Sequence, residues 1–232
     1  MPLYRYVKSV PNRPVQKSRS LSYGLMGMGV VILVWTVWPI LSFSSLSEQL
    51  AKTVSPVSDG VNILRPRESF LQAADFQNPN TWFPTKPQKK VTAIVNTYTI
   101  SIPRLKIKDA LVTVAGDDLA VSLVHYGGTP LPGQFGNSVI FGHSTLPQFF
   151  NVAKYKTIFS FLPSMKIGDE ASIHFDNMDY RYIVYDMVVV EPTDLSPLEQ
   201  KFDDSYLTLI TCVPPGTYWK RLNVKARLVK PL

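Results

Sequence analysis

A long apolar run near the amino terminus constrains this chain more than any other feature. Residues 20–47 include no charged side chain, and residues 21–41 are predominantly apolar. A helix needs about 20 apolar residues to cross the hydrocarbon core of a bilayer. Trp35 lies towards one end of the run and Tyr23 towards the other, where membrane helices place their aromatic belts. The sequence therefore predicts one transmembrane helix over residues 21–43.

Basic residues on one side of this run predict its orientation. Five of them precede it without any acidic residue, and Glu48 is the first charge after it. Because basic flanks stay in the cytoplasm, residues 1–20 are predicted to be a cytoplasmic tail and the rest extracellular. A cleaved signal peptide is the alternative, but its apolar region spans only about 7–15 residues and ends at a small-residue site. The longer run, with no Ala-x-Ala site after it, favours an uncleaved anchor of a single-pass protein in the cell membrane. The five basic residues are Arg5, Lys8, Arg13, Lys17 and Arg19.

The distribution of charge argues against a nucleic-acid-binding protein. The formal net charge is +7, but five of the 24 basic residues belong to the amino-terminal tail. The 19 that remain nearly balance the 17 acidic residues. A nucleic-acid-binding domain concentrates its basic excess on the folded part of the chain. We therefore predict no nucleic-acid partner.

The region after the membrane segment divides into a linker and a β-rich domain. Prolines interrupt residues 44–90 repeatedly, which disfavours regular helix or sheet and predicts an extracellular linker. Residues 76–84 are richer in aromatic side chains than a plain linker needs. They are expected to dock on the domain, either as a lid or as a linker end that caps the edge of the core.

Residues 91–232 show short β-rich runs separated by turn signals such as Gly168-Asp169. Many short strands separated by regularly spaced turns predict a mainly β fold, either a barrel or a sandwich. One or two helical turns are expected within residues 149–161. The candidate strands are residues 97–102, 110–114, 138–141, 171–175, 180–190, 206–211 and 222–229.

Cys212 is the single cysteine of the chain, so no intrachain disulfide can form. An unpaired thiol in an exported protein is either reactive or simply a small buried apolar group. His143 follows the apolar run 139–141, and Cys212 ends another such run. Arg221 lies nine residues after Cys212, beyond a Pro-Pro-Gly turn that lets the chain reverse and place the two side by side.

These three residue types suit nucleophilic attack on a peptide carbonyl. A neighbouring imidazolium or guanidinium favours the thiolate, which is the nucleophile. A fixed cationic donor can stabilise the negative charge that develops on the carbonyl oxygen. The histidine can protonate the leaving amine. We therefore predict His143, Cys212 and Arg221 as the catalytic residues.

Several motifs in this order resemble those of the sortase family. Residues 208–212, Thr-Leu-Ile-Thr-Cys, resemble the sortase signature around the nucleophile, and Arg221 stands at a spacing typical of the essential arginine. Residues 128–143, from Gly-Thr-Pro-Leu-Pro-Gly to Phe-Gly-His, are similar to the segment that leads to the catalytic histidine. Ile-Pro-Arg-Leu-Lys-Ile at 102–107 and Lys-Ile-Gly-Asp at 166–169 are similar to two further family motifs.

The resemblance implies an eight-stranded sortase-type β-barrel whose groove holds the cysteine, histidine and arginine. It also implies cleavage of a carboxy-terminal sorting signal such as Leu-Pro-x-Thr-Gly through a thioester acyl-enzyme. An amine of a cell-wall precursor or a pilin lysine would then take the acyl group from the surface protein or pilin. We predict no cofactor and assign no metal. Residues 214–218 are closer to the non-housekeeping classes, whereas Asn78 to Trp82 matches the Asp-Pro-aromatic lid motif of pilin-assembling sortases only loosely.

The roles of several other side chains have more than one interpretation. His125 is a candidate substrate contact, with a packing role at the end of a strand as the alternative. Thr211 is a second candidate substrate-binding residue, although a β-branched side chain also suits strand packing. His174 is expected to face outward without a catalytic role. A membrane-tethered β-domain that binds a wall or surface protein without catalysis is the alternative to an enzyme.

Overall fold

The computed structural model describes residues 16–51, 77–83, 86–89 and 97–229. Contacts divide the chain into two compact units, Met1–Leu41 and Ser42–Leu232. Most of the predicted cytoplasmic tail, the central part of the predicted linker, and the first residues of the predicted catalytic domain lie outside the described ranges. The described residues form one long helix, a short ordered segment and a β-barrel.

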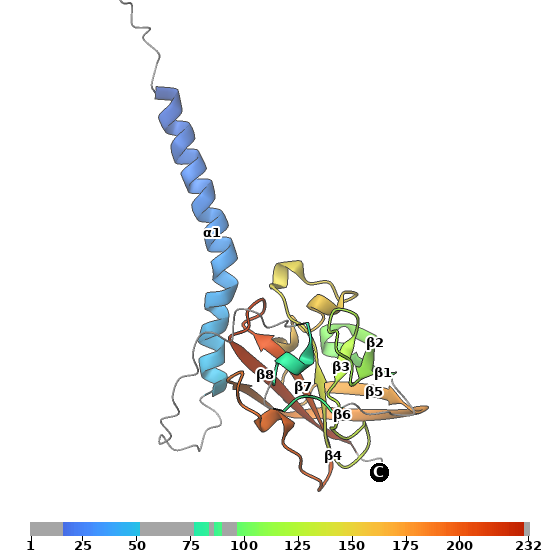
Figure 1. The fold of residues 1–232 in the computed structure, drawn as a ribbon. Helices are drawn as coiled ribbons and strands as arrows, with labels where there is room; N and C mark the ends of the chain where they lie inside the picture. The colour runs from blue at the N-terminus through green and yellow to red at the C-terminus, as the bar shows by residue number, and fades with distance from the viewer. Residues whose placement is uncertain (1–15, 52–76, 84–85, 90–96, 230–232) are drawn as a thin grey trace, which may run out of the picture. The chain divides into compact units, whose positions relative to one another are not determined.

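Helix α1 spans Gln16–Ala51 and contains the predicted membrane segment (Figure 1). Its section Leu21–Trp38 is long and apolar enough to cross a membrane, and all of its side chains are exposed. The helix continues beyond residue 43 into the segment predicted as linker. An apolar helix surface of this length without protein cover is suited to lipid.

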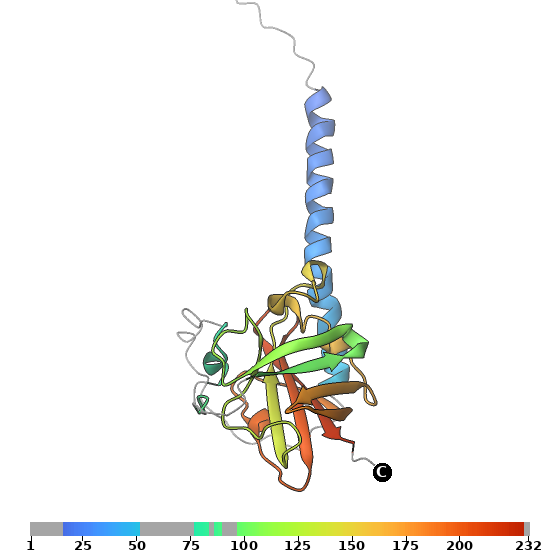
Figure 2. The ribbon, with the colours of Figure 1, turned by 90° about the vertical axis from the view of Figure 1, so that its right-hand side faces the viewer.

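Eight strands close into a barrel in the order β1-β2-β3-β4-β7-β8-β6-β5, which confirms the mainly β, eight-stranded prediction (Figures 1 and 2). The β2–β3 and β4–β7 pairs are parallel, and all the others are antiparallel. The strands are β1 Thr97–Ile102, β2 Ile107–Val114, β3 Leu123–His125, β4 Gly136–Phe141, β5 Glu170–Phe175, β6 Met178–Val190, β7 Ser205–Val213 and β8 Lys220–Leu228.

Single-turn 3-10 helices occupy several of the connections. Pro147–Phe149 and Tyr155–Thr157 lie at or near the helical turns expected within 149–161. Pro79–Thr81 forms another in the ordered segment 77–83, where the Asn78 side chain accepts a hydrogen bond from the Asn80 backbone N–H. Proline at the first position suits such a turn, because its missing N–H would lack an intrahelical partner there in any case.

Strand β7 is buried on both faces, which determines where the functional side chains lie. Leu207 and Leu209 belong to the core cluster inside the barrel. Ile210 and Cys212 belong to a second apolar cluster, together with Trp82. Because side chains alternate along a strand, the even-numbered residues of β7 face outward beneath a covering layer. Cys212 therefore lies on the outer face of the sheet.

Candidate active site

Cys212 and Arg221 are direct partners across the antiparallel β7–β8 pair. Arg221 Nη1 donates to Cys212 Sγ at 3.4 Å. Both side chains are almost fully buried, at 1% and 2% exposure. The Pro-Pro-Gly turn that joins the strands includes Gly216 at a φ of 84°, a left-handed conformation that glycine adopts without strain. The chain thus reverses as the sequence predicted, and the guanidinium lies beside the thiol.

His143 follows β4, which lies next to β7 in parallel register. Two hydrogen bonds hold its flanking residues against β7: the Gly142 N–H donates to Ile210 O at 3.1 Å, and Ser144 Oγ donates to Cys212 O at 2.7 Å. A Cβ on Gly142 would lie 2.4 Å from the Phe159 ring, so only glycine fits this close approach. The structure therefore fastens the backbone on either side of His143 to the strand that carries Cys212.

Trp82 is the residue at this site that the sequence did not single out as functional. The Arg221 Cζ lies 4.7 Å from the centroid of the Trp82 ring, a cation–π contact. The same ring lies 6.1 Å from His143 and meets Phe141 edge-on at 5.3 Å. The aromatic content of residues 76–84 indicated docking on the domain, but not that the docked ring would contact two predicted catalytic residues.

A family model described as the sortase domain matches residues 100–229, more than half of the chain. The chain belongs to the sortase family.

Solved sortase structures agree with this assignment. Sortase C-1 from Actinomyces oris is 28% identical to this sortase, with a TM-score of 0.52, and the match covers 60% of this chain and 76% of that one. Sortase C1 from Streptococcus agalactiae is 29% identical, with a TM-score of 0.52 and coverage of 61% and 72%. The sortase D5 transpeptidase of Clostridium perfringens, at 24% identity, a TM-score of 0.50 and coverage of 61% and 83%, shares the fold. The search among curated proteins found no match.

Burial controls the chemistry of the thiol in this sortase. Desolvation raises the pKa of Cys212 to about 11, and the charge of Arg221 lowers it only in part. Desolvation of a thiolate outweighs one cation at this distance because the site is sealed by its covering layer. Burial beneath this layer therefore opposes the thiolate that a neighbouring guanidinium would favour.

Thr211 holds two strands together at the site. Its hydroxyl donates to Gly142 O at 2.8 Å, and its side chain is fully buried. This bond joins the residue before Cys212 to the residue before His143. The geometry favours a positioning role over the predicted direct contact with substrate.

His125 points to the other face of the sheet. Its neighbour Val124 belongs to the outer cluster, whereas Tyr98, which contacts the His125 ring, belongs to the barrel core. His125 Nδ1 lies 2.8 Å from Tyr98 Oη, and burial lowers the pKa of His125 to about 4. This placement favours the packing alternative over a substrate contact. His174 is exposed and lies 2.7 Å from Asp179, as expected for an outward-facing residue.

Proposed function

We propose that this sortase is a membrane-anchored cysteine transpeptidase that cleaves a Leu-Pro-x-Thr-Gly-like sorting signal and joins its acyl half to an amine. The observation that carries the proposal is the pairing of Cys212 with Arg221 beside the segment of His143. A thiol and a guanidinium 3.4 Å apart, in a family of transpeptidases, suit acyl transfer through sulfur.

Each residue has a defined part in the reaction. The Cys212 thiolate attacks the threonine carbonyl carbon, and the carbonyl oxygen takes up the negative charge next to the Arg221 guanidinium. The carbon–nitrogen bond breaks as His143 delivers a proton to the leaving amine, which leaves a thioester on Cys212. An incoming amine then attacks the thioester carbonyl, loses a proton to His143, and releases the thiolate.

Trp82 must move before this reaction begins. The thiol is 1% exposed beneath the layer that includes Trp82, so no substrate carbonyl can approach it in the described arrangement. Displacement of Trp82 would hydrate the thiol, which removes the main cause of its raised pKa, and would free the guanidinium from the ring. Uncovering the site and activating the nucleophile are therefore one event in this proposal.

The anchor sets the substrate class. With basic residues before the apolar section of α1 and the barrel after it, the catalytic domain would face outward. Substrates would then be exported surface proteins or pilins held at the same membrane. The acceptor would be an amine of a cell-wall precursor or a pilin lysine.

The covalent step provides the decisive experiment. The full chain in detergent is incubated with sorting-signal peptides, quenched in acid, and analysed by mass spectrometry. We expect an adduct on Cys212 equal in mass to the acyl half of the peptide, which hydroxylamine discharges. Cys212→Ala should show neither adduct nor cleavage, and His143→Ala should be severely impaired. Cleavage by Cys212→Ala would refute the mechanism. A wild-type chain that forms no adduct with any sorting peptide would instead favour a non-catalytic binding domain.

A further inference from the structure

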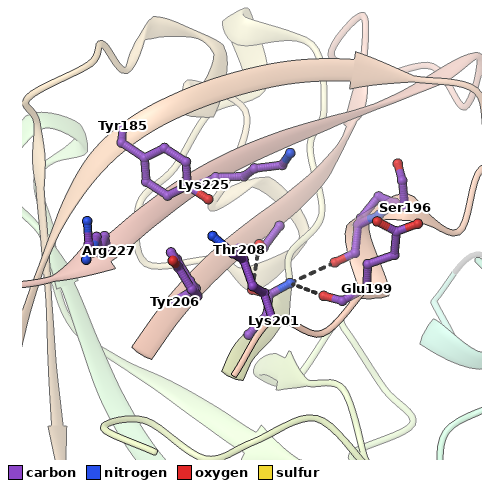
Figure 3. Close-up of a pocket in the computed structure, with 10 residues that line it drawn as sticks. Tyr185, Ser196, Glu199, Lys201, Tyr206, Thr208, Lys225 and Arg227 are labelled. Carbon is purple, nitrogen blue, oxygen red and sulfur yellow. Dashed lines mark hydrogen bonds between the residues drawn. The ribbon is translucent and has the colours of Figure 1, made fainter. Parts of the chain in front are cut away.

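A cavity lies on the same side of the barrel as Cys212. It has a volume of about 400 Å³ and lies between residues 196–201, which precede β7, and the outer surface of β6, β7 and β8 (Figure 3). Asn137 fastens these residues to β4, because its Nδ2 donates to Pro197 O at 3.0 Å and to Glu199 O at 3.3 Å. The cavity therefore has one wall made by a connection that is tied down and a floor made by strands.

Strand register relates this cavity to the nucleophile. Thr208 pairs with Lys225 and Tyr206 pairs with Arg227, and all four line the cavity. These positions are an even number of residues from the Cys212–Arg221 pair, so their side chains face the same way as the thiol. At about 3.3 Å per residue, Thr208 and Tyr206 lie about 13 Å and 20 Å along β7 from Cys212.

The strand face between the thiol and the cavity is covered in the described structure. Ile210 belongs to the outer cluster that includes Trp82 and Leu198. Its partner Asn223 is 1% exposed, and its Oδ1 has no hydrogen-bond partner among the residues that the structure describes. Movement of Trp82 would remove part of this cover, and a peptide N–H laid across the stretch would supply the donor that Asn223 lacks.

The chemistry selects which half of the substrate lies there. The leaving amine and the incoming amine occupy the same place in turn. The side of the thiol on which they exchange must therefore be open to solvent. The acyl half stays attached through both steps of transfer. A walled surface that extends along β7 therefore suits the acyl half.

We propose that the cavity binds the substrate polypeptide at the fifth to seventh residues before the scissile bond, counting the acylated threonine as the first. The inference rests on the proposed function. An extended peptide advances about 3.3 Å per residue, so a Leu-Pro-x-Thr core ends before the cavity and the residues preceding that core enter it.

The chemistry of the lining defines the contact. The Tyr185 and Tyr206 rings lie with their centroids 6.0 Å apart and present an aromatic surface to the cavity. The three lining cations are already paired: Lys201 with Asp203 at 2.7 Å, Lys225 with Asp186 at 3.5 Å and Arg227 with Asp204 at 2.5 Å. The cavity therefore recognises a peptide through aromatic packing and hydrogen bonds rather than through net charge.

Peptidyl chloromethyl ketones test this inference without an acceptor amine. The full chain in detergent is treated with Leu-Pro-Ala-Thr chloromethyl ketone, either unextended or extended at its amino end to successive lengths. Sulfur displaces chloride to form a thioether on Cys212, and mass spectrometry follows its rate. We expect the rate to rise roughly three- to tenfold as the extension enters the cavity, the range expected for contact with an aromatic pair, and then to level off.

Variants separate the cavity from the chemistry. Tyr185→Ala should abolish the gain from extension while leaving the unextended reagent unaffected, because Tyr185 lines the cavity and is not part of the apolar cluster around Cys212. Met178→Ala, an exposed apolar side chain outside the lining, is the control and should retain the gain. Equal rates at every length, or a gain that survives Tyr185→Ala, would overturn the inference alone. No labelling of Cys212 at any length would refute the proposed function, and this inference with it.

Discussion

The Arg221 guanidinium lies 3.4 Å from the Cys212 sulfur because the two residues are direct partners across β7 and β8. The strand pairing itself, rather than a flexible loop, sets this distance. The same Nη1 atom also donates to the backbone carbonyls of Tyr218 and Lys220, each at 3.4 Å, so three contacts hold this corner of the guanidinium. A donor held in this way is oriented before a substrate arrives, which is the condition for stabilising an oxyanion efficiently.

Replacing Arg221 by lysine tests this orientation. An ammonium group keeps the charge but lacks the planar fork, so we expect Arg221→Lys to lower kcat by roughly 10²–10³, the range for losing an oxyanion donor. Steady-state cleavage of a sorting peptide measures the effect, with circular dichroism as the check on folding. Near-normal turnover by the lysine variant would exclude Arg221 as the oxyanion donor.

Removing the Trp82 ring should expose the thiol. A pKa of about 11 leaves about 100-fold less thiolate at pH 7 than the ordinary thiol value near 9, so the covered thiol should react slowly. We expect Trp82→Ala to raise the rate of iodoacetamide alkylation of Cys212 at pH 7 by up to about 100-fold. Trp219→Ala, at a tryptophan that is 62% exposed, is the matched control and should change little. Equal rates in the wild type and Trp82→Ala would show that Trp82 does not shield the thiol.

The Thr211 hydroxyl should affect turnover rather than binding. Thr211→Val leaves the Gly142 carbonyl without this donor, at a cost of about 1–3 kcal/mol in stability. Because that bond joins the strand ends that bear Cys212 and His143, we expect kcat to fall at least about fivefold with KM unchanged, as for a comparable loss in the transition state. Thr211→Ser retains the hydroxyl and should restore kcat. A change confined to KM would indicate direct substrate contact instead.

His125 should make the barrel sensitive to acid. Its folded pKa of about 4 lies below the ordinary value of 6.5, so the unfolded chain binds the proton more readily between these values. The stability that the buried neutral ring provides is present above pH 6.5 and is lost as the pH falls towards 4. It amounts to about 3 kcal/mol at 1.36 kcal/mol per pH unit.

Denaturation of wild type and His125→Gln in detergent from pH 7 to pH 4 measures this contribution. The glutamine variant, which does not titrate, should be less stable at pH 7, and the gap between the two should narrow as the pH falls. Parallel stability curves would show that His125 is not the group responsible.

The sequence predicted the parts of this protein that depend on local pattern. The apolar run, the alternating strands, and the reversal between Cys212 and Arg221 all follow from nearby residues. Strand β3 was missed because Leu123–His125 is too short to show a period. The face of the sheet to which the His125 side chain points could not be predicted from the sequence, because it depends on Val124 facing outward in the assembled sheet. The contact between Trp82 and Arg221 joins segments far apart in the sequence, and no local pattern encodes it.

Parallel pairing of β4 with β7 has a consequence for how preparations of this protein should be judged. The register places Val139 beside Thr208 and Phe141 beside Ile210, which carries the thiol to the outer face. A slip of β7 by one residue would present Thr211 in place of Cys212 and turn the sulfur into the barrel. Such molecules would have the same strand content and the same mass as correctly paired ones. Titration of reactive thiols after Trp82 has been displaced would therefore count the correctly paired molecules. Spectroscopy of secondary structure cannot distinguish the two forms.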